Sequence, residues 1–261
     1  MSSSEIDLSE FYSPLGTALI ESIYFDDYLS IGGTGSTDIL AAEAGITAAS
    51  NVLDVGSGLG GPALHLAQNH GCRVTGLDIV ESNVQTANER AAARGLDQLA
   101  NFRLGDAMAM PFEAGQFDVI VGQDAWCHVP DKDKLIAECA RVITPGGMVA
   151  FTDWLAVGEM DGADRDEVLA AMAAPNLATL ASHAANLDRH GFTVLKQDDI
   201  SAVFISQYND IIARLESMEG EISETFSAKL YSIIHNLNGR IRRAFDDGKL
   251  GGGRIVARKD H

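Results

Sequence analysis

A glycine-rich turn that follows a short apolar strand constrains this chain more than any other feature. Apolar residues at 52–55 lead into Gly56-Ser-Gly-Leu-Gly-Gly61, and a helical pattern follows at 63–70. Glycines allow positive φ and let a ligand approach the main chain, while the next helix offers unpaired N–H groups at its N-terminus. A second strand, 72–77, is followed by Asp78, at the spacing typical of a carboxylate that binds a ribose diol. The pattern predicts a nucleoside cofactor on a Rossmann-like sheet.

Strand and helix patterns alternate through the middle of the chain. The expected strands are 52–55, 72–77, 100–104, 117–122 and 147–153. The expected helices between them are 63–70, 83–94 and 132–142. Alternation of this kind predicts an α/β fold in which a parallel sheet carries helices on both faces.

The two ends of the chain have a different pattern and suggest three parts. Apolar residues at helical spacing from Leu15 to Ile23 indicate a helix, and Ser36 is a candidate N-cap for a second helix at 37–44. Beyond the last alternating strand we expect a helical segment at 161–187, a strand at 191–196, helices at 202–218 and 222–246, and a final strand at 253–258. The predicted parts are a helical lid (1–50), a cofactor-binding core (51–155) and a third part (156–261). This third part holds substrate or lid helices and the last two strands.

Composition narrows the class of protein. The chain has 37 Asp and Glu against 19 Lys and Arg, a net charge of −18, which disfavours nucleic acid as a partner and suits a solvated surface or a salty cytosol. It has no apolar run long enough to span a membrane and no signal-peptide pattern at its start. Three cysteines without metal-ligand spacing fit a reducing cytoplasm and predict no metal site.

Four segments, in order along the chain, resemble the motifs of class I S-adenosylmethionine (SAM) methyltransferases. Asp54-Val-Gly-Ser-Gly58 resembles motif I, and Gly105-Asp106-Ala107 resembles the motif on the adenine side. Asp118-Val-Ile-Val-Gly-Gln123 is similar to the fourth strand, and Pro145-Gly-Gly147 to the turn before the fifth. The glycine turn by itself would also fit a nicotinamide cofactor, whereas the ordered series favours SAM.

The resemblance implies a set of cofactor contacts. Gly56, Gly58 and Gly60 are expected to face the methionine part of SAM, Asp78 the ribose hydroxyls and Asp106 the adenine amino group. The other cofactor-binding residues that it implies are Tyr24, Ser30, Ile79, Ala107 and Gln123.

A histidine after the fourth strand is the candidate catalytic group. Methyl transfer to an amine requires loss of the amine proton, and His128, in Gln123-Asp-Ala-Trp-Cys-His128, could accept or relay it. The stretch from Tyr12 to Trp154 resembles the phosphoethanolamine methyltransferases, in which a tyrosine near the N-terminus pairs with such a histidine. The resemblance implies a catalytic dyad of Tyr12 and His128.

The chain departs from that family where the phosphate would bind. Trp154 stands where a tyrosine is expected, and only Lys249 could replace a basic residue of the family. A second resemblance, to sarcosine/dimethylglycine N-methyltransferases of glycine betaine synthesis, includes the Asp-Ala-x-x-His pattern and Phe151-Thr-Asp153. The aromatic faces of Trp126 and Trp154 could contact a methylated ammonium group. Asp124 and Lys249 complete the expected substrate site.

The sequence therefore predicts a SAM-dependent N-methyltransferase of a small amine or amino acid, with sarcosine or dimethylglycine preferred. The alternatives are methyl transfer to phosphoethanolamine or to another small N-, C- or S-nucleophile, and a SAM-binding subunit without activity. The expected partner is a small-molecule amine, with no nucleic acid and no membrane. The oligomeric state stays open.

Overall fold

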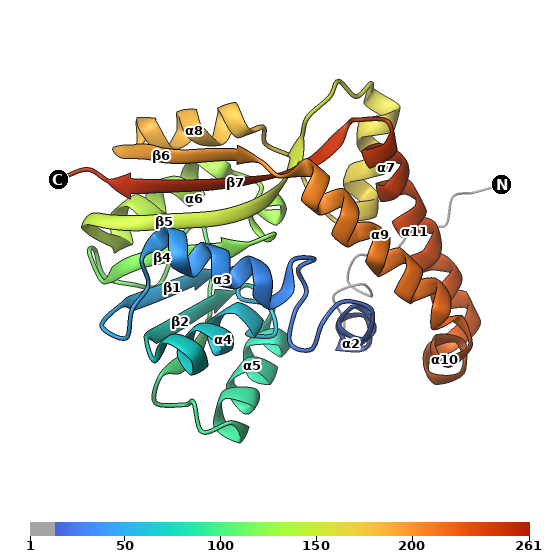
Figure 1. Cartoon of the computed structure of the whole chain (residues 1–261), viewed down its shortest axis with the longest axis horizontal. Helices are drawn as coiled ribbons and strands as arrows, with labels where there is room; N and C mark the ends of the chain where they lie inside the picture. Colours follow the sequence, from blue (N-terminus) through green and yellow to red (C-terminus); the bar gives the residue numbers. More distant parts are fainter. Residues whose placement is uncertain (1–13) are drawn as a thin grey trace.

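The computed structural model describes residues 14–261 and shows a seven-stranded sheet with helices on both faces (Figure 1). The strand order is β3-β2-β1-β4-β5-β7-β6, and β7 runs antiparallel to both of its neighbours. The expected Rossmann-like α/β fold is confirmed, with an antiparallel strand added near one edge. The strands are β1 (Asn51–Val55), β2 (Arg73–Asp78), β3 (Ala100–Leu104), β4 (Phe117–Gln123), β5 (Ile143–Ala156), β6 (Phe192–Asp199) and β7 (Leu250–Lys259).

The helices follow the strands in three groups along the chain. The first four are α2 (Pro14–Ile23), α3 (Gly33–Ala44), α4 (Gly61–His70) and α5 (Glu81–Ala93). They are followed by α6 (Lys132–Val142), α7 (Gly162–Met172), α8 (Leu180–Arg189) and α9 (Ser201–Ser217). The last are α10 (Glu219–Ile222), a π-helical turn at Ser223–Ser227, and α11 (Ala228–Asp246).

The two faces of the sheet bury alternate residues of each strand. Val52 and Val74 pack with α3, α4 and α5 on one face, whereas Leu53 and Leu77 pack with α6 and α8 on the other. Figure 1 shows these two helical layers on opposite sides of the strands. Both faces are thus covered, as expected for a sheet that is mostly parallel.

A third apolar cluster forms at the carboxyl ends of the strands. Leu19 of α2, Phe204 of α9 and Ile241 of α11 pack there with Trp154 from the end of β5. The Arg214 guanidinium of α9 also donates to the Tyr24 carbonyl (2.9 Å), so the segment after α2 is tied to the C-terminal helices. These helices lie together beyond the sheet in Figure 1 and form one wall of the site described below.

Two local expectations are wrong. The segment 161–187 is two helices, because Pro175 cannot continue a helix and Ala173 has a positive φ of 53°. Ser36 is not an N-cap, since α3 begins at Gly33 and the Ser36 N–H already donates to the Gly32 carbonyl. The α3 helix packs on the sheet, and the division into a lid (1–50), a core and a third part stays a prediction.

No helix within residues 14–261 is long and apolar enough to cross a membrane. The same residues contain no cluster of His, Cys, Asp and Glu suited to a metal ion.

Candidate active site

A cavity of about 480 Å³ lies at the carboxyl ends of β1, β2, β4 and β5. The glycine turn after β1 forms its floor, because the Gly56 N–H donates to the Leu77 carbonyl (2.8 Å) and the Gly58 N–H to the Asp78 carboxylate (2.8 Å). Gly56 has φ of 81°, and a Cβ there would lie 2.5 Å from the Ala125 Cβ. The turn therefore needs glycine both for its conformation and for the space.

Gly60 has a different role from the one expected. It does not line the cavity: it precedes α4 with φ of 92°, and a Cβ would lie 2.8 Å from the Phe102 ring. Gly60 allows the turn to pack on β3, and only Gly56 and Gly58 of the expected trio reach the cavity.

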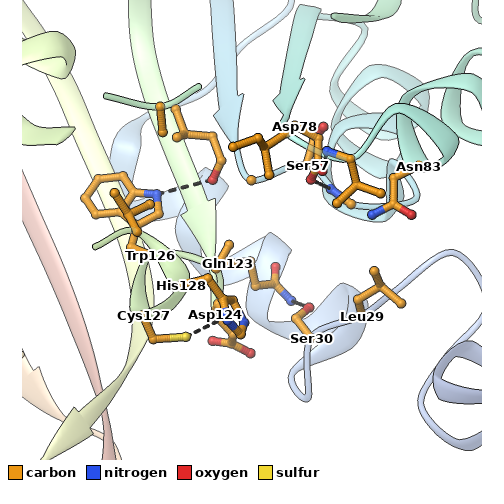
Figure 2. A pocket seen from close by; sticks show the side chains of 18 of the residues that line it. Leu29, Ser30, Ser57, Asp78, Asn83, Gln123, Asp124, Trp126, Cys127 and His128 are labelled. Atoms are coloured by element: carbon orange, nitrogen blue, oxygen red, sulfur yellow. Dashed lines mark hydrogen bonds between the residues drawn. The ribbon is translucent and has the colours of Figure 1, made fainter. Parts of the chain in front are cut away.

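Acidic side chains at the ends of β2 and β3 line the cavity: Asp78, labelled in Figure 2, and Asp106. The Asp78 carboxylate also accepts the Val80 N–H (2.9 Å); burial raises the pKa of this carboxyl, and its hydrogen bonds oppose that rise. The Asp106 carboxylate accepts the Met108 N–H (2.8 Å). Ile79, 69% exposed, and Ala107 complete this rim. Carboxylates next to a glycine turn suit a ribose and a cationic amino-acid group, so the residues present fit SAM.

Gln123, at the end of β4, connects the N-terminal segment to the sheet. Its amide nitrogen donates to the Ser30 hydroxyl (2.8 Å) and to the Gly33 carbonyl (3.0 Å), and its oxygen accepts from Thr37 (2.8 Å). Figure 2 shows the bond to Ser30 at the cavity wall. Ser30, Tyr24 and Gln123 all line the cavity, while the polar atoms of Gln123 already bind protein groups.

Asp124 is a buried carboxyl in a left-handed conformation, with φ of 57°. Its oxygens accept from the Thr152 hydroxyl (2.6 Å) and from the Ile31 N–H (3.1 Å). Burial and the nearby Asp153 raise the pKa of the Asp124 carboxyl to about 7, although both hydrogen bonds oppose the rise. Backbone strain of this kind collects at functional sites.

His128 ends a 3₁₀ turn, Trp126–His128, and lines the cavity. Its Nδ1 lies 3.2 Å from the Ala173 carbonyl. Because a carbonyl only accepts, Nδ1 carries the proton and Nε2 has the basic lone pair. Burial lowers the pKa of the imidazole, and the Ala173 carbonyl partly opposes this. A neutral imidazole is the form that a general base needs.

Other expected residues are placed in different ways. Tyr12 lies outside the described residues, so its pairing with His128 stays a prediction. Trp154 is 7% exposed, lines the cavity and packs edge-on against Tyr208. Lys249 is not on the cavity wall, because its ammonium group pairs with Asp164 and Asp247.

Trp126 is packed into the core at the cavity wall. Its side chain is fully buried, its indole N–H donates to the Val55 carbonyl (3.2 Å), and its ring stacks on Phe151 with 4.0 Å between centroids. The expected contact of Trp126 with an ammonium group stays a prediction.

Sequence reasoning named Tyr24 and Trp154 but missed the rest of the apolar half of the cavity, most of which comes from α2, α7 and α11. These side chains come from segments far apart in the sequence, and the amphipathic pattern of 222–246 was the available signal. The apolar residues of this half, beside Trp154, are Ile20, Tyr24, Leu29, Ala171, Met172 and Ile241.

The fold and the glycine turn define a class I SAM methyltransferase, and comparison with known proteins places the chain in that family. A family model described as a methyltransferase domain matches residues 53–151. The 27-O-demethylrifamycin SV methyltransferase of Amycolatopsis mediterranei is 30% identical over 244 residues, covering 90% of this chain and 88% of that protein. The chain belongs to the SAM-dependent methyltransferases and is an enzyme of that class.

Solved structures agree with this assignment. A protein from Galdieria sulphuraria with the provisional name sarcosine dimethylglycine methyltransferase has a TM-score of 0.81 and 25% identity, over 87% of this chain and 86% of that one. Haemonchus contortus phosphoethanolamine N-methyltransferase 2, solved with SAM, has a TM-score of 0.88 and 22% identity. That match covers 100% of this chain and 61% of the other, and it concerns the fold alone.

Proposed function

We propose that this enzyme methylates an uncharged oxygen or nitrogen nucleophile on a small, largely apolar molecule. One observation carries the proposal: within residues 14–261, no Lys or Arg lines the cavity. The preceding residues, 1–13, contain no Lys or Arg in their sequence. The part of the cavity wall formed by residues 14–261 therefore offers no lysine or arginine to hold a carboxylate or phosphate.

An anionic acceptor would meet an unfavourable environment. Asp78, Asp106 and Asp124 line the cavity, and burying a charge without a partner costs several kcal/mol. The buried cation Lys132 does not line the cavity, because its ammonium group donates to the carbonyls of Cys127 (3.0 Å) and Val129 (2.6 Å). A neutral acceptor avoids this cost.

The apolar wall suits such an acceptor. Ile20, Trp154, Met172 and Ile241 line the cavity. Burying an apolar group there contributes about 25 cal/mol per Å² of apolar surface removed from water. The wall thus favours an apolar body and excludes water from the nucleophile.

His128 would remove the proton of the nucleophile. Bound SAM would supply an electrophilic methyl group, whose bond to sulfur breaks as the new bond forms, so that S-adenosylhomocysteine is left. As the nucleophile forms its bond to that methyl, its O–H or N–H proton passes to Nε2 of His128, while Nδ1–H stays bonded to the Ala173 carbonyl (3.2 Å). The proton leaves later to solvent, and the imidazole returns to its neutral form.

A near full-length relative supports this proposal. The Amycolatopsis enzyme, by its name, methylates an oxygen of a rifamycin, and it aligns over 88% of its own length.

A second candidate is N-methylation of sarcosine or dimethylglycine. The likeness to the Galdieria structure over most of both chains favours it, as does the Asp-Ala-x-x-His pattern. In that case the substrate carboxylate would bind only N–H or hydroxyl donors. Phosphoethanolamine, with two charges to hold, is disfavoured further.

An acceptor panel tests the proposal. Purified enzyme with SAM is assayed for S-adenosylhomocysteine with neutral apolar alcohols, phenols and amines, and in parallel with sarcosine, dimethylglycine and phosphoethanolamine. His128→Gln serves as the control for non-enzymatic transfer. We expect the highest kcat/KM among the neutral apolar acceptors. A higher kcat/KM for sarcosine or dimethylglycine than for every neutral acceptor would overturn the proposal in favour of the second candidate.

A further inference from the structure

The short turn that carries His128 is held by two buried charged side chains that lie outside the cavity wall, Asp153 of β5 and Lys132 of α6. Cys127, in the middle of the turn, donates its N–H to the Asp153 carboxylate (2.8 Å). Its carbonyl accepts from the Lys132 ammonium group (3.0 Å). Both backbone polar groups of the residue before His128 are thus bound by side chains of opposite charge.

Asp153 is itself held in place. It lies on β5, is 1% exposed, and uses its second oxygen to accept from the His183 Nε2 (3.0 Å). His183 comes from α8 and is fully buried against the Phe151 ring. One carboxylate oxygen therefore binds the turn and the other binds the helix, which leaves the Asp153 side chain little freedom to rotate.

Lys132 joins the two segments that lie on either side of the imidazole. From the start of α6 it donates to the carbonyls of Cys127, Val129 (2.6 Å) and Asn176 (3.3 Å). Asn176 lies in the same connection after α7 whose Ala173 carbonyl accepts from His128. Lys132 thus holds the donor ring and its acceptor at a constant separation.

We propose that Asp153, braced by His183, and Lys132 are positioning residues that hold the His128 imidazole toward the reacting atoms. None of the three lines the cavity, so they act on the reaction only through the turn. Replacement of a buried ion pair by apolar residues is often neutral or stabilising, so fold stability alone gives little reason for three buried charged or polar groups here. The inference rests on the proposed role of His128 as base.

The same groups act on His128 through their charge, and with opposite signs. Burial, the largest influence, lowers the pKa of the imidazole. Asp153 favours the protonated imidazole and raises its pKa, whereas Lys132 lowers it, and across the cavity the Asp78 carboxylate also raises it. Loss of Asp153 or of Lys132 should therefore move the His128 titration in opposite directions, which a purely structural role does not predict.

A histidine NMR titration tests the inference without any acceptor. The variants are Asp153→Asn and Lys132→Met, with Asp97→Asn and Lys134→Met as matched controls on exposed positions. The His128 signal is assigned by its loss in His128→Gln. We expect its midpoint to fall in Asp153→Asn, to rise in Lys132→Met and to stay unchanged in both controls. Movement of both midpoints in the same direction, or of neither, overturns the electrostatic part of the inference.

The kcat of the same two variants tests whether Asp153 and Lys132 position the His128 imidazole. A displacement of about 1 Å at a reacting group can cost on the order of 100-fold in rate, so kcat should fall at least about ten-fold in both variants while SAM affinity is unchanged. His183→Gln, which keeps an N–H donor for Asp153, should retain activity that His183→Leu loses. Equal kcat in the folded Gln and Leu variants overturns the role of His183. A failed acceptor panel leaves the NMR result intact, so the two proposals fail separately.

Discussion

The substitution Gly56→Ala should show how far SAM binding depends on the conformation of the glycine turn, apart from the general stability of the fold. The left-handed conformation costs a non-glycine residue about 1–2 kcal/mol, and overpacking typically costs about 1–3 kcal/mol. Both apply, because φ is 81° and the new Cβ would lie 2.5 Å from the Ala125 Cβ. The sum is about 2–5 kcal/mol. This free-energy cost should appear either as lower stability of the fold or as a shift of the turn that breaks the hydrogen bond from the Gly58 N–H to Asp78.

Gly45→Ala is the matched control. Gly45 follows α3 with φ of 68°, and beyond its chain neighbours no atom lies within 4 Å of the place that a Cβ would take, so only the conformational cost applies there. Isothermal titration with SAM and urea unfolding measure the two variants side by side. Gly56→Ala should weaken SAM binding at least about ten-fold, equivalent to about 1.4 kcal/mol. Gly45→Ala should lose about 1–2 kcal/mol of stability and bind SAM normally.

The reasoning fails if Gly56→Ala binds SAM as tightly as the wild type and unfolds at the same urea concentration. It fails equally if the two alanine variants lose the same SAM affinity. Either result would mean that the close approach of Gly56 to Ala125 does not shape the cofactor site.

Three further predictions concern protons and the acceptor. His128→Gln should lower kcat about 10²–10⁴-fold and abolish the fall in rate at acid pH, where the wild-type imidazole becomes protonated; a pH–rate profile checks both. Burial and the nearby Asp78 raise the pKa of the Asp54 carboxyl to about 7. The stability that the protonated carboxyl contributes is therefore lost as pH rises from about 4 to 7. Asp54→Asn should therefore raise the unfolding free energy of the SAM-free protein more at about pH 8 than at about pH 4, by up to a few kcal/mol. Trp154→Ala should raise KM for a neutral apolar acceptor and leave the SAM dissociation constant unchanged, as measured by kinetics and calorimetry.

The sequence predicted much of the sheet because its signals are local. The strand at 100–104 and the helix at 132–142 have the expected bounds, since both follow from hydrophobic period and flanking residues. Asp78 and His128 were located for the same reason: each comes at or just after the end of a strand whose carboxyl end must lie at the ligand edge of the sheet. The order of these strands and turns is sufficient to predict the methyltransferase fold and its cofactor.

Contacts between distant segments had no such signal. The sequence does not show that Phe151 of β5 stacks on the Trp126 ring. It also does not show that Lys249 forms an ion pair with Asp164. The break at Ala173, which supplies the carbonyl for His128, follows α7, a helix that packs on the distant α11.

Composition and motif order by themselves determined the α/β class, the cofactor edge and the position of the candidate catalytic histidine, because periodicity and glycine turns act over a few residues. Tertiary structure alone decided the charge of the substrate cavity. Its walls come from α2, α7 and α11 as well as the strand ends, and only their packing shows that acidic and apolar side chains line it while the buried Lys132 donates to backbone carbonyls. Which side chains share a cavity is set by contacts across the whole chain, and no local pattern encodes them.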